Sequence, residues 1–210
     1  MKTQIVPEPR WAALVATLAA GCVYWALPEP LSVGPSWGLA AVLLVLLIPI
    51  IVAYRRGVHR ISRILTLLAN TVITLAMIGS LVFLIQGIPR HREDPRTLLR
   101  SAVALWITNV LVFALWYWKL DGGGPIVREA RHSRLESSFL FPQMVLTDGG
   151  DPSWTPHFVD YLFLAFNTST AFSPTDTAVL SRWAKVCMML QSLISLTIVA
   201  LLAARAVNIL

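Results

Sequence analysis

The stretch that decides the fold is the last quarter of the chain, residues 158–210, which read FVDYLFLAFNTSTAFSPTDTAVLSRWAKVCMMLQSLISLTIVALLAARAVNIL. It opens with an apolar segment, Phe158 to Phe166, that is too short to cross a bilayer. A polar run follows, and the chain breaks at Ser173-Pro174. From Ala184 onward about 20 residues are apolar, which is enough for a full crossing. The pattern predicts a half-helix, a polar break and a whole helix.

Lipid offers no hydrogen-bond partners, so irregular backbone at membrane depth is tolerated only where protein or trapped water satisfies it. Residues 158–176 are therefore expected to form a re-entrant loop that dips into the bilayer and returns on the side from which it entered. Its hydroxyl and carbonyl oxygens suit alkali or alkaline-earth cations. The candidate ion pathway comprises Asn167, Thr168, Ser169, Thr170, Ser173, Thr175 and Asp176. The same residues are also compatible with an ordinary polar turn and helix cap.

Two polar residues of the last helix complete the candidate site. Gln191 and Ser195 are four positions apart, so they share a helix face. Polar groups are unusual inside a membrane span, and these two are expected to line a cavity beside the polar break. Arg205 lies near the end of the same helix, where its long side chain can reach the interface.

The layout from Leu98 to Leu210 resembles the pore module of potassium channels: outer helix, pore helix, threonine-rich filter, proline-containing turn and inner helix. The corresponding letters are STAFSPTD, residues 169–176, followed by LSRWAK, residues 180–185. The resemblance implies a channel-like protein that passes cations, including monovalent ones, as a homo-oligomer. Where the family has two filter glycines this chain has Phe172 and Pro174, so potassium selectivity does not carry over.

The same half of the chain also resembles a family of bacterial multi-pass membrane proteins of unknown function. Those proteins end in a similar aromatic half-helix, polar break and terminal helix that contains asparagine. This resemblance implies a bacterial inner (plasma) membrane location and brings no activity with it.

Composition places the chain in a membrane. Of its 210 residues, 56% are hydrophobic and 13% are charged, against about a quarter charged in soluble proteins. The net charge of +6 is best explained by basic loops that face anionic headgroups, not by binding to nucleic acid. Cys22 and Cys187 both fall in apolar segments, so they are expected to be small buried packing residues and not a disulfide.

Four more spans are expected upstream of the last helix: Trp11–Leu27, Trp37–Tyr54, Ile64–Ile88 and Leu98–Leu120. Trp11, Tyr24 and Trp25 are expected in the interfacial aromatic belts. An interfacial anchor is also expected at the end of the fourth span, where Trp116, Tyr117 and Trp118 precede Lys119.

Polar residues in the third span are predicted to mediate a helix contact. Asn70 and Thr74 are four positions apart and share a face. A contact with another helix is favoured over a cavity wall, because interhelical hydrogen bonds are the common use of such residues in membranes. The long loop from Asp121 to His157 is expected to lie along the membrane surface or to cover the re-entrant segment.

The sequence thus predicts an all-α integral membrane protein with five transmembrane helices plus one re-entrant, pore-helix-like half-helix before the last span. It forms one membrane domain, residues 1–210, with a three-span part (1–97) and a two-span part with the pore-loop-like module (98–210). No histidine, cysteine or carboxylate spacing indicates a metal, cofactor or catalytic site, so no enzyme is expected.

Three functions remain open: a cation channel, a non-conducting membrane scaffold or accessory subunit whose re-entrant segment is structural, and, more weakly, a small-solute transporter. Orientation is a point of conflict. The channel resemblance places the C-terminus in the cytoplasm and, with five spans, the N-terminus outside. The distribution of basic residues instead favours the N-terminus inside.

Overall fold

The computed structural model describes residues 11–35, 37–87, 95–130, 137–145, 154–170 and 176–207, and these are mostly helical. The long helices are α1 (Trp11–Trp25), α2 (Gly38–Arg55), α3 (His59–Gly87), α4 (Pro95–Leu120) and α8 (Arg182–Val207). The shorter helical elements are η1 (Glu29–Leu31), η3 (Asp121–Gly123), α5 (Pro125–Ala130), α6 (Pro142–Val145) and α7 (Phe158–Thr170).

Four helices are long and apolar enough to cross a membrane, which indicates an integral membrane protein. They are Gly38–Arg55, His59–Gly87, Arg96–Gly123 and Arg182–Ala204. The fifth expected span, α1, is apolar but only 15 residues long. At 1.5 Å per residue it extends about 22 Å, less than the roughly 30 Å of a bilayer core.

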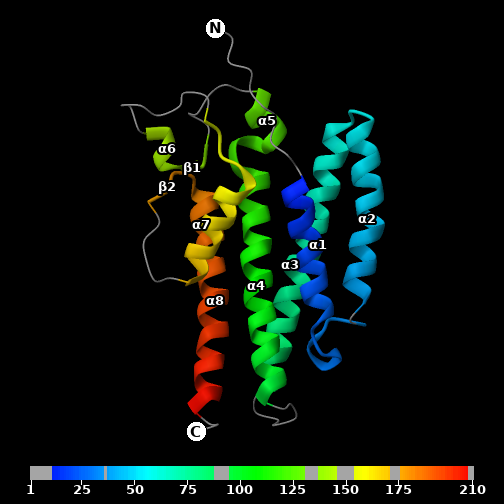
Figure 1. Cartoon of the computed structure of the whole chain (residues 1–210), viewed down its shortest axis with the longest axis vertical. Helices are drawn as coiled ribbons and strands as arrows, with labels where there is room; N and C mark the ends of the chain where they lie inside the picture. The colour runs from blue at the N-terminus through cyan, green and yellow to red at the C-terminus, as the bar shows by residue number, and fades with distance from the viewer. Residues whose placement is uncertain are drawn as a thin grey trace.

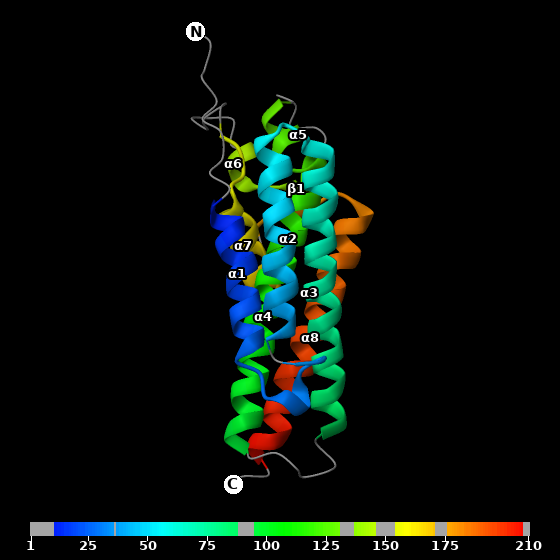
Figure 2. The ribbon, with the colours of Figure 1, turned by 90° about the vertical axis from the view of Figure 1, so that its right-hand side faces the viewer.

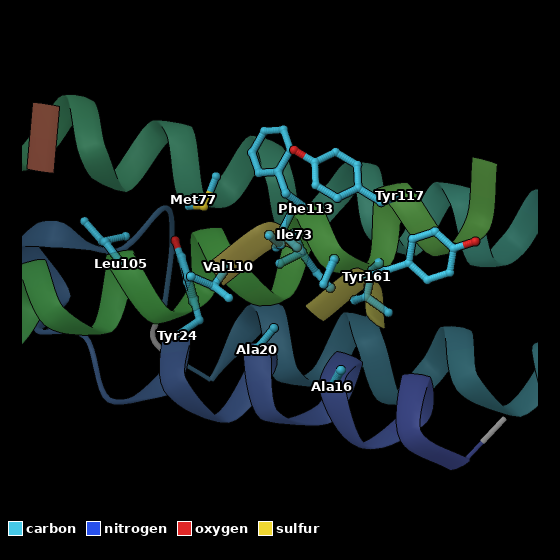
Figure 3. Packing of buried hydrophobic residues seen from close by; sticks show 14 of the residues in the cluster. Ala16, Ala20, Tyr24, Ile73, Met77, Leu105, Val110, Phe113, Tyr117 and Tyr161 are labelled. Atoms are coloured by element: carbon cyan, nitrogen blue, oxygen red, sulfur yellow. The ribbon is translucent and has the colours of Figure 1, made fainter. Parts of the chain in front are cut away.

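The long helices lie side by side, with α4 at the centre of the bundle (Figures 1 and 2). Helices α1, α3, α7 and α8 all pack on α4, and α2 packs on α1 and α3. Figure 3 shows the core that joins α1, α3 and α4. Its buried members include Ala16, Ala20, Tyr24, Ile73, Met77, Leu105, Val110 and Phe113.

Small residues bring α1 close to its neighbours. Ala13, Ala16 and Ala20 are buried on one face of the helix, and a Cβ on Gly21 would lie 2.9 Å from Leu43 Cδ1 of α2. Close approach at small residues is the usual basis of helix packing in membranes, where lipid removes the hydrophobic driving force.

Two residues of α1 lie in other surroundings than expected. Tyr24 is fully buried in the bundle, where its hydroxyl accepts hydrogen bonds from Ser80 Oγ (3.0 Å) and the Val33 amide (2.7 Å), so its side chain does not face lipid headgroups as a residue of an aromatic belt would. Cys22 is exposed on the helix surface, so it is not the buried packing residue that was expected, whereas Cys187 of α8 is half-buried and packs against the core. Both cysteines are free.

The expected interfacial anchor at the end of α4 is instead part of the core. Tyr117, Trp118 and Lys119 are all buried. The Lys119 ammonium donates to the Thr66 carbonyl of α3 at 3.2 Å. One turn earlier, Trp116 Nε1 donates to Thr74 Oγ1 at 3.0 Å. The predicted helix contact through Thr74 is therefore confirmed, and it ties α3 to α4.

A two-stranded sheet departs from the all-α prediction. Strand β1 (Phe139–Leu140) pairs antiparallel with β2 (Ala178–Val179), with Phe139 opposite Val179. The Phe139 side chain explains the placement of β1, because its ring lies among those of Tyr117, Tyr161 and Trp183 at centroid distances of 5.2–6.1 Å.

Helix boundaries differ most from the predictions in α3 and α7. α3 begins at His59 and not at Ile64. α7 continues through the polar residues to Thr170 and does not end at Phe166. In that last turn Thr168 and Thr170 donate to the carbonyl oxygens of Leu164 (2.8 Å) and Asn167 (3.0 Å), so their hydroxyls are satisfied inside the helix.

Candidate functional site

Helices α7 and α8 run in the same direction from the same end of the bundle (Figure 1). Near their starts Tyr161 and Trp183 both contact the Phe139 ring. Further along both helices, Gln191 of α8 contacts Ala165 and Ser169 of α7. Two adjacent parallel helices require a connection that returns to the end where the first one started. The 13 residues of α7 extend only about 20 Å.

The side chain of Gln191 is the centre of the site. It is fully buried, and its Nε2 donates to the Ala165 carbonyl and to Ser169 Oγ, both at 2.7 Å. Its Oε1 accepts a short hydrogen bond from the Tyr117 hydroxyl of α4. Both amide hydrogens and the amide oxygen are thus bonded, and one side chain joins three helices.

A second set of bonds extends this network along α8. Asn109 of α4 donates through Nδ2 to Ser195 Oγ (2.9 Å) and to the Gln191 carbonyl (3.2 Å). Ser192 Oγ donates to the Thr168 carbonyl at 3.3 Å. These contacts fix the register of α8 against both α4 and α7.

The residues expected to line an ion pathway differ in their burial. Thr168 and Ser169 are buried, and Asn167 and Thr170 are half-buried. Asp176 is exposed beside β2. Ser173 and Thr175 lie outside the described residues. The two expected cavity-lining residues, Gln191 and Ser195, are both buried and bonded to neighbouring helices.

The outer faces of the two helices are apolar. On α7 the exposed large side chains are Val159, Phe163 and Phe166. On α8 they include Val186, Met189, Leu190, Leu193, Leu196 and Val199. The buried polar residues Thr168, Ser169, Gln191 and Ser195 are turned inward, and the outer surface of the pair resembles a lipid-facing one.

The sequence did not point to Asp121 of η3, which was expected only as the first residue of the long loop. Its buried carboxylate contacts the start of α7. Its oxygens accept hydrogen bonds from Ser137 Oγ (2.9 Å), the Ser138 amide and the Tyr161 hydroxyl (2.6 Å). Nearby, the Arg128 guanidinium lies 5.1 Å from the centre of the Tyr161 ring. The signal in the sequence was a lone acidic residue between an aromatic helix end and three glycines.

Residues 137–141, which we call the strap, cover the start of α7. Phe141 packs edge-on against Tyr161 at 5.4 Å, and Trp183 Nε1 donates to Ser138 Oγ at 3.1 Å. The long loop was expected either to lie along the membrane surface or to cover the half-helix. The strap, which is part of this loop, covers the half-helix. Together with Asp121 the strap encloses α7 from the end of the bundle.

Within the described residues, no group of three or more histidine, cysteine or acidic side chains lies together to hold a metal ion. Comparison with known proteins finds no matching family model, no matching curated protein and no matching solved structure. The resemblances to a potassium-channel pore module and to bacterial multi-pass proteins therefore stay expectations from the sequence.

Proposed function

We propose that the protein is a non-conducting integral membrane scaffold or accessory subunit in which α7 is a structural re-entrant segment. The observation that carries this proposal is the closed hydrogen bonding of Gln191, whose side-chain amide bonds to Tyr117, Ala165 and Ser169. A polar group that coordinates ions must leave its oxygens free for them. Here the oxygens hold helices together.

The surface of the α7–α8 pair supports the same proposal. A water-filled path between copies of the chain would run along the outward residues of these helices, such as Phe163, Phe166 and Leu193. Those side chains are apolar and offer no ligands to a cation. They suit lipid or the apolar surface of another membrane protein.

We further propose that α7 enters the bilayer from the end of the bundle where α4 stops and α8 starts. Its length of about 20 Å is less than the roughly 30 Å of the hydrocarbon core, and its neighbours supply the hydrogen-bond partners that lipid lacks. On this arrangement α1 is the fifth span, because, unlike α7, it is followed by a helix, α2, that runs back from the opposite end of the bundle (Figure 1). Its buried face of small residues packs on helices that are long enough to cross.

The orientation follows from charge. The end at which α7 starts carries Arg55, Arg60, Arg63, Arg128 and Arg182. The start of α4 at the opposite end carries Arg96 and Arg100. The positive-inside tendency places the first end in the cytoplasm. The bacterial inner membrane is the location that fits the resemblance.

One observation favours the second candidate, a cation channel formed by several copies. The C-terminal end of α7 lies beside the middle of α8, and helix C-termini carry partial negative charge that attracts cations. Parallel pore and inner helices also occur in the channel module that the sequence resembles. The ion path would then involve Thr170 and the residues that follow it.

Conductance separates the two candidates. Purified full-length protein, shown to be folded by circular dichroism, is reconstituted into planar bilayers in potassium chloride, and its oligomeric state is determined by native mass spectrometry. The scaffold proposal expects no current above that of empty bilayers. Cation current that changes on Thr170→Ala or Asp176→Asn substitution would overturn it and support the channel. Thr197→Val on the outer part of α8 serves as the matched control, because the Thr197 hydroxyl bonds only to its own helix.

A further inference from the structure

A pocket of about 620 Å³ lies away from α7, between α1, α2, α3 and the end of α4. Its walls come from the first turns of α1, from α2 between Leu43 and Arg55 and from the first half of α3, with Gly123, Gly124, Pro125 and Val127 at its end. In Figure 1 this is the upper end of the bundle, where the turn between α2 and α3 stands beyond the start of α1. Neither the channel nor the scaffold candidate uses it.

The inner part of the pocket is apolar. Its lining there includes Leu43, Leu47 and Ile50 of α2 and Leu67 and Ala69 of α3. From Leu43 to Arg55 the α2 wall extends about 18 Å at 1.5 Å per residue. One leaflet of the hydrocarbon core is about 15 Å deep. The length of the pocket therefore matches an acyl chain in one leaflet.

The outer part of the pocket is basic. Arg55, Arg60 and Arg63 line it together with Lys119 and His59, and none of the described residues that line it is acidic. The arginines are exposed and can reach an anion at the membrane surface. Basic pockets between membrane helices on the cytoplasmic side are a recognised setting for anionic headgroups.

Lys119 brings a buried amino group to the pocket, and the residues that the structure describes satisfy only part of its hydrogen-bonding capacity. The side chain is 6% exposed, and its ammonium makes one hydrogen bond, to the Thr66 carbonyl, and no ion pair with any residue that the structure describes. An ammonium has three donor hydrogens, and a buried charge is costly unless it is paired. A phosphate in the pocket would supply the missing partner.

We propose that this pocket binds an anionic phospholipid of the cytoplasmic leaflet, with an acyl chain along α2 and the phosphate beside Lys119, Arg55, Arg60 and Arg63. The apolar depth selects a lipid over a soluble phosphate, and the basic mouth selects an anionic lipid over a zwitterionic one. The site is independent of whether the protein conducts ions.

The test is lipid retention in native mass spectrometry of the full-length protein. Dioleoyl phosphatidylglycerol and dioleoyl phosphatidylcholine are titrated separately in mild detergent, because the two lipids share their chains and differ in charge. We expect preferential retention of one phosphatidylglycerol per chain. Lys119→Met and Arg63→Gln should each weaken the binding of phosphatidylglycerol about fivefold, because each basic residue near the membrane surface contributes roughly 1 kcal/mol. Arg100→Gln, an exposed arginine at the opposite end of α4, should leave it unchanged.

Further variants protect the test against misfolding. Lys119 contacts α3, so its replacement could disturb packing. Arg63 is exposed, so its replacement removes a charge without disturbing the core. Leu47 is half-buried, and Leu47→Trp fills the apolar part of the pocket. Leu47→Trp should reduce retention of phosphatidylglycerol while circular dichroism stays unchanged. Equal retention of the two lipids, wild-type retention in folded Arg63→Gln and Leu47→Trp proteins, or complete displacement of the lipid by millimolar inorganic phosphate would each overturn the proposal.

Discussion

Gln191 binds Ser169 directly: its Nε2 donates to Ser169 Oγ at 2.7 Å and thereby joins the middle of α8 to the last turn of α7. The same amide also reaches Tyr117 on α4. Besides packing on α4, the half-helix α7 is held by a buried amide that three helices share, and such a network is an effective means of fixing its position.

Replacing Gln191 by leucine should destabilise the protein by about 2 kcal/mol, because it leaves the Tyr117 hydroxyl and the Ala165 carbonyl buried without their partner. Thermal unfolding in mild detergent, followed by circular dichroism, measures the change. Thr197→Val is the control on the same helix. An unchanged melting temperature in Gln191→Leu would show that the network does not hold α7.

Asn109 and Ser195 should be energetically coupled. Interhelical hydrogen bonds in membranes average about 0.6 kcal/mol and reach about 1.7 kcal/mol, and this one is buried and 2.9 Å long. A double-mutant cycle with Asn109→Leu and Ser195→Ala, read as unfolding free energy, should give a coupling in that range. Strictly additive single effects would mean that the contact contributes nothing beyond packing.

The long helices could be predicted from the sequence because a bilayer demands continuous apolar runs. The end of α7 could not be predicted in this way, because threonine and serine are common in loops but can also bond to the backbone of their own helix, as Thr168 does. The same limit applies to the site. Gln191 was identified as polar and inward, but its partner Tyr117 lies 74 positions away in sequence, and no local pattern reveals that pairing.

The position of Lys119 shows a further limit. Aromatic residues followed by lysine at a helix end usually mark a membrane interface. Here α3 covers this helix end, and the Lys119 side chain is buried against Thr66 of α3. Tertiary contacts decide which of the two roles such a cluster takes.

Asp121→Asn should loosen the strap. The carboxylate accepts bonds from Ser137, Ser138 and Tyr161, and bonds to a charged group contribute about 1.5–3 kcal/mol each. Hydrogen exchange measured by mass spectrometry should show faster exchange in peptides that contain residues 137–141 and no change in α2 peptides. Asp176→Asn, at an exposed carboxylate, is the matched control. Equal exchange in both variants would assign the anchoring to the other contacts of the strap, the rings of Phe139 and Phe141 and the hydrogen bond from Trp183 to Ser138.

Gly124→Ala should destabilise the turn between α4 and α5 by about 1–3 kcal/mol. Gly124 has φ 97° and ψ 168°, a region that is essentially restricted to glycine, and an added Cβ would lie 2.9 Å from the Lys119 carbonyl oxygen. Gly87→Ala is the control, because Gly87 ends α3 with no atom within 4 Å of an added Cβ, and alanine favours helix by up to about 1 kcal/mol. The two alanine variants should therefore move the melting temperature in opposite directions. A Gly124→Ala protein as stable as the wild type would mean that the backbone can leave this conformation without loss, and that the end of α4 is held by side chains alone.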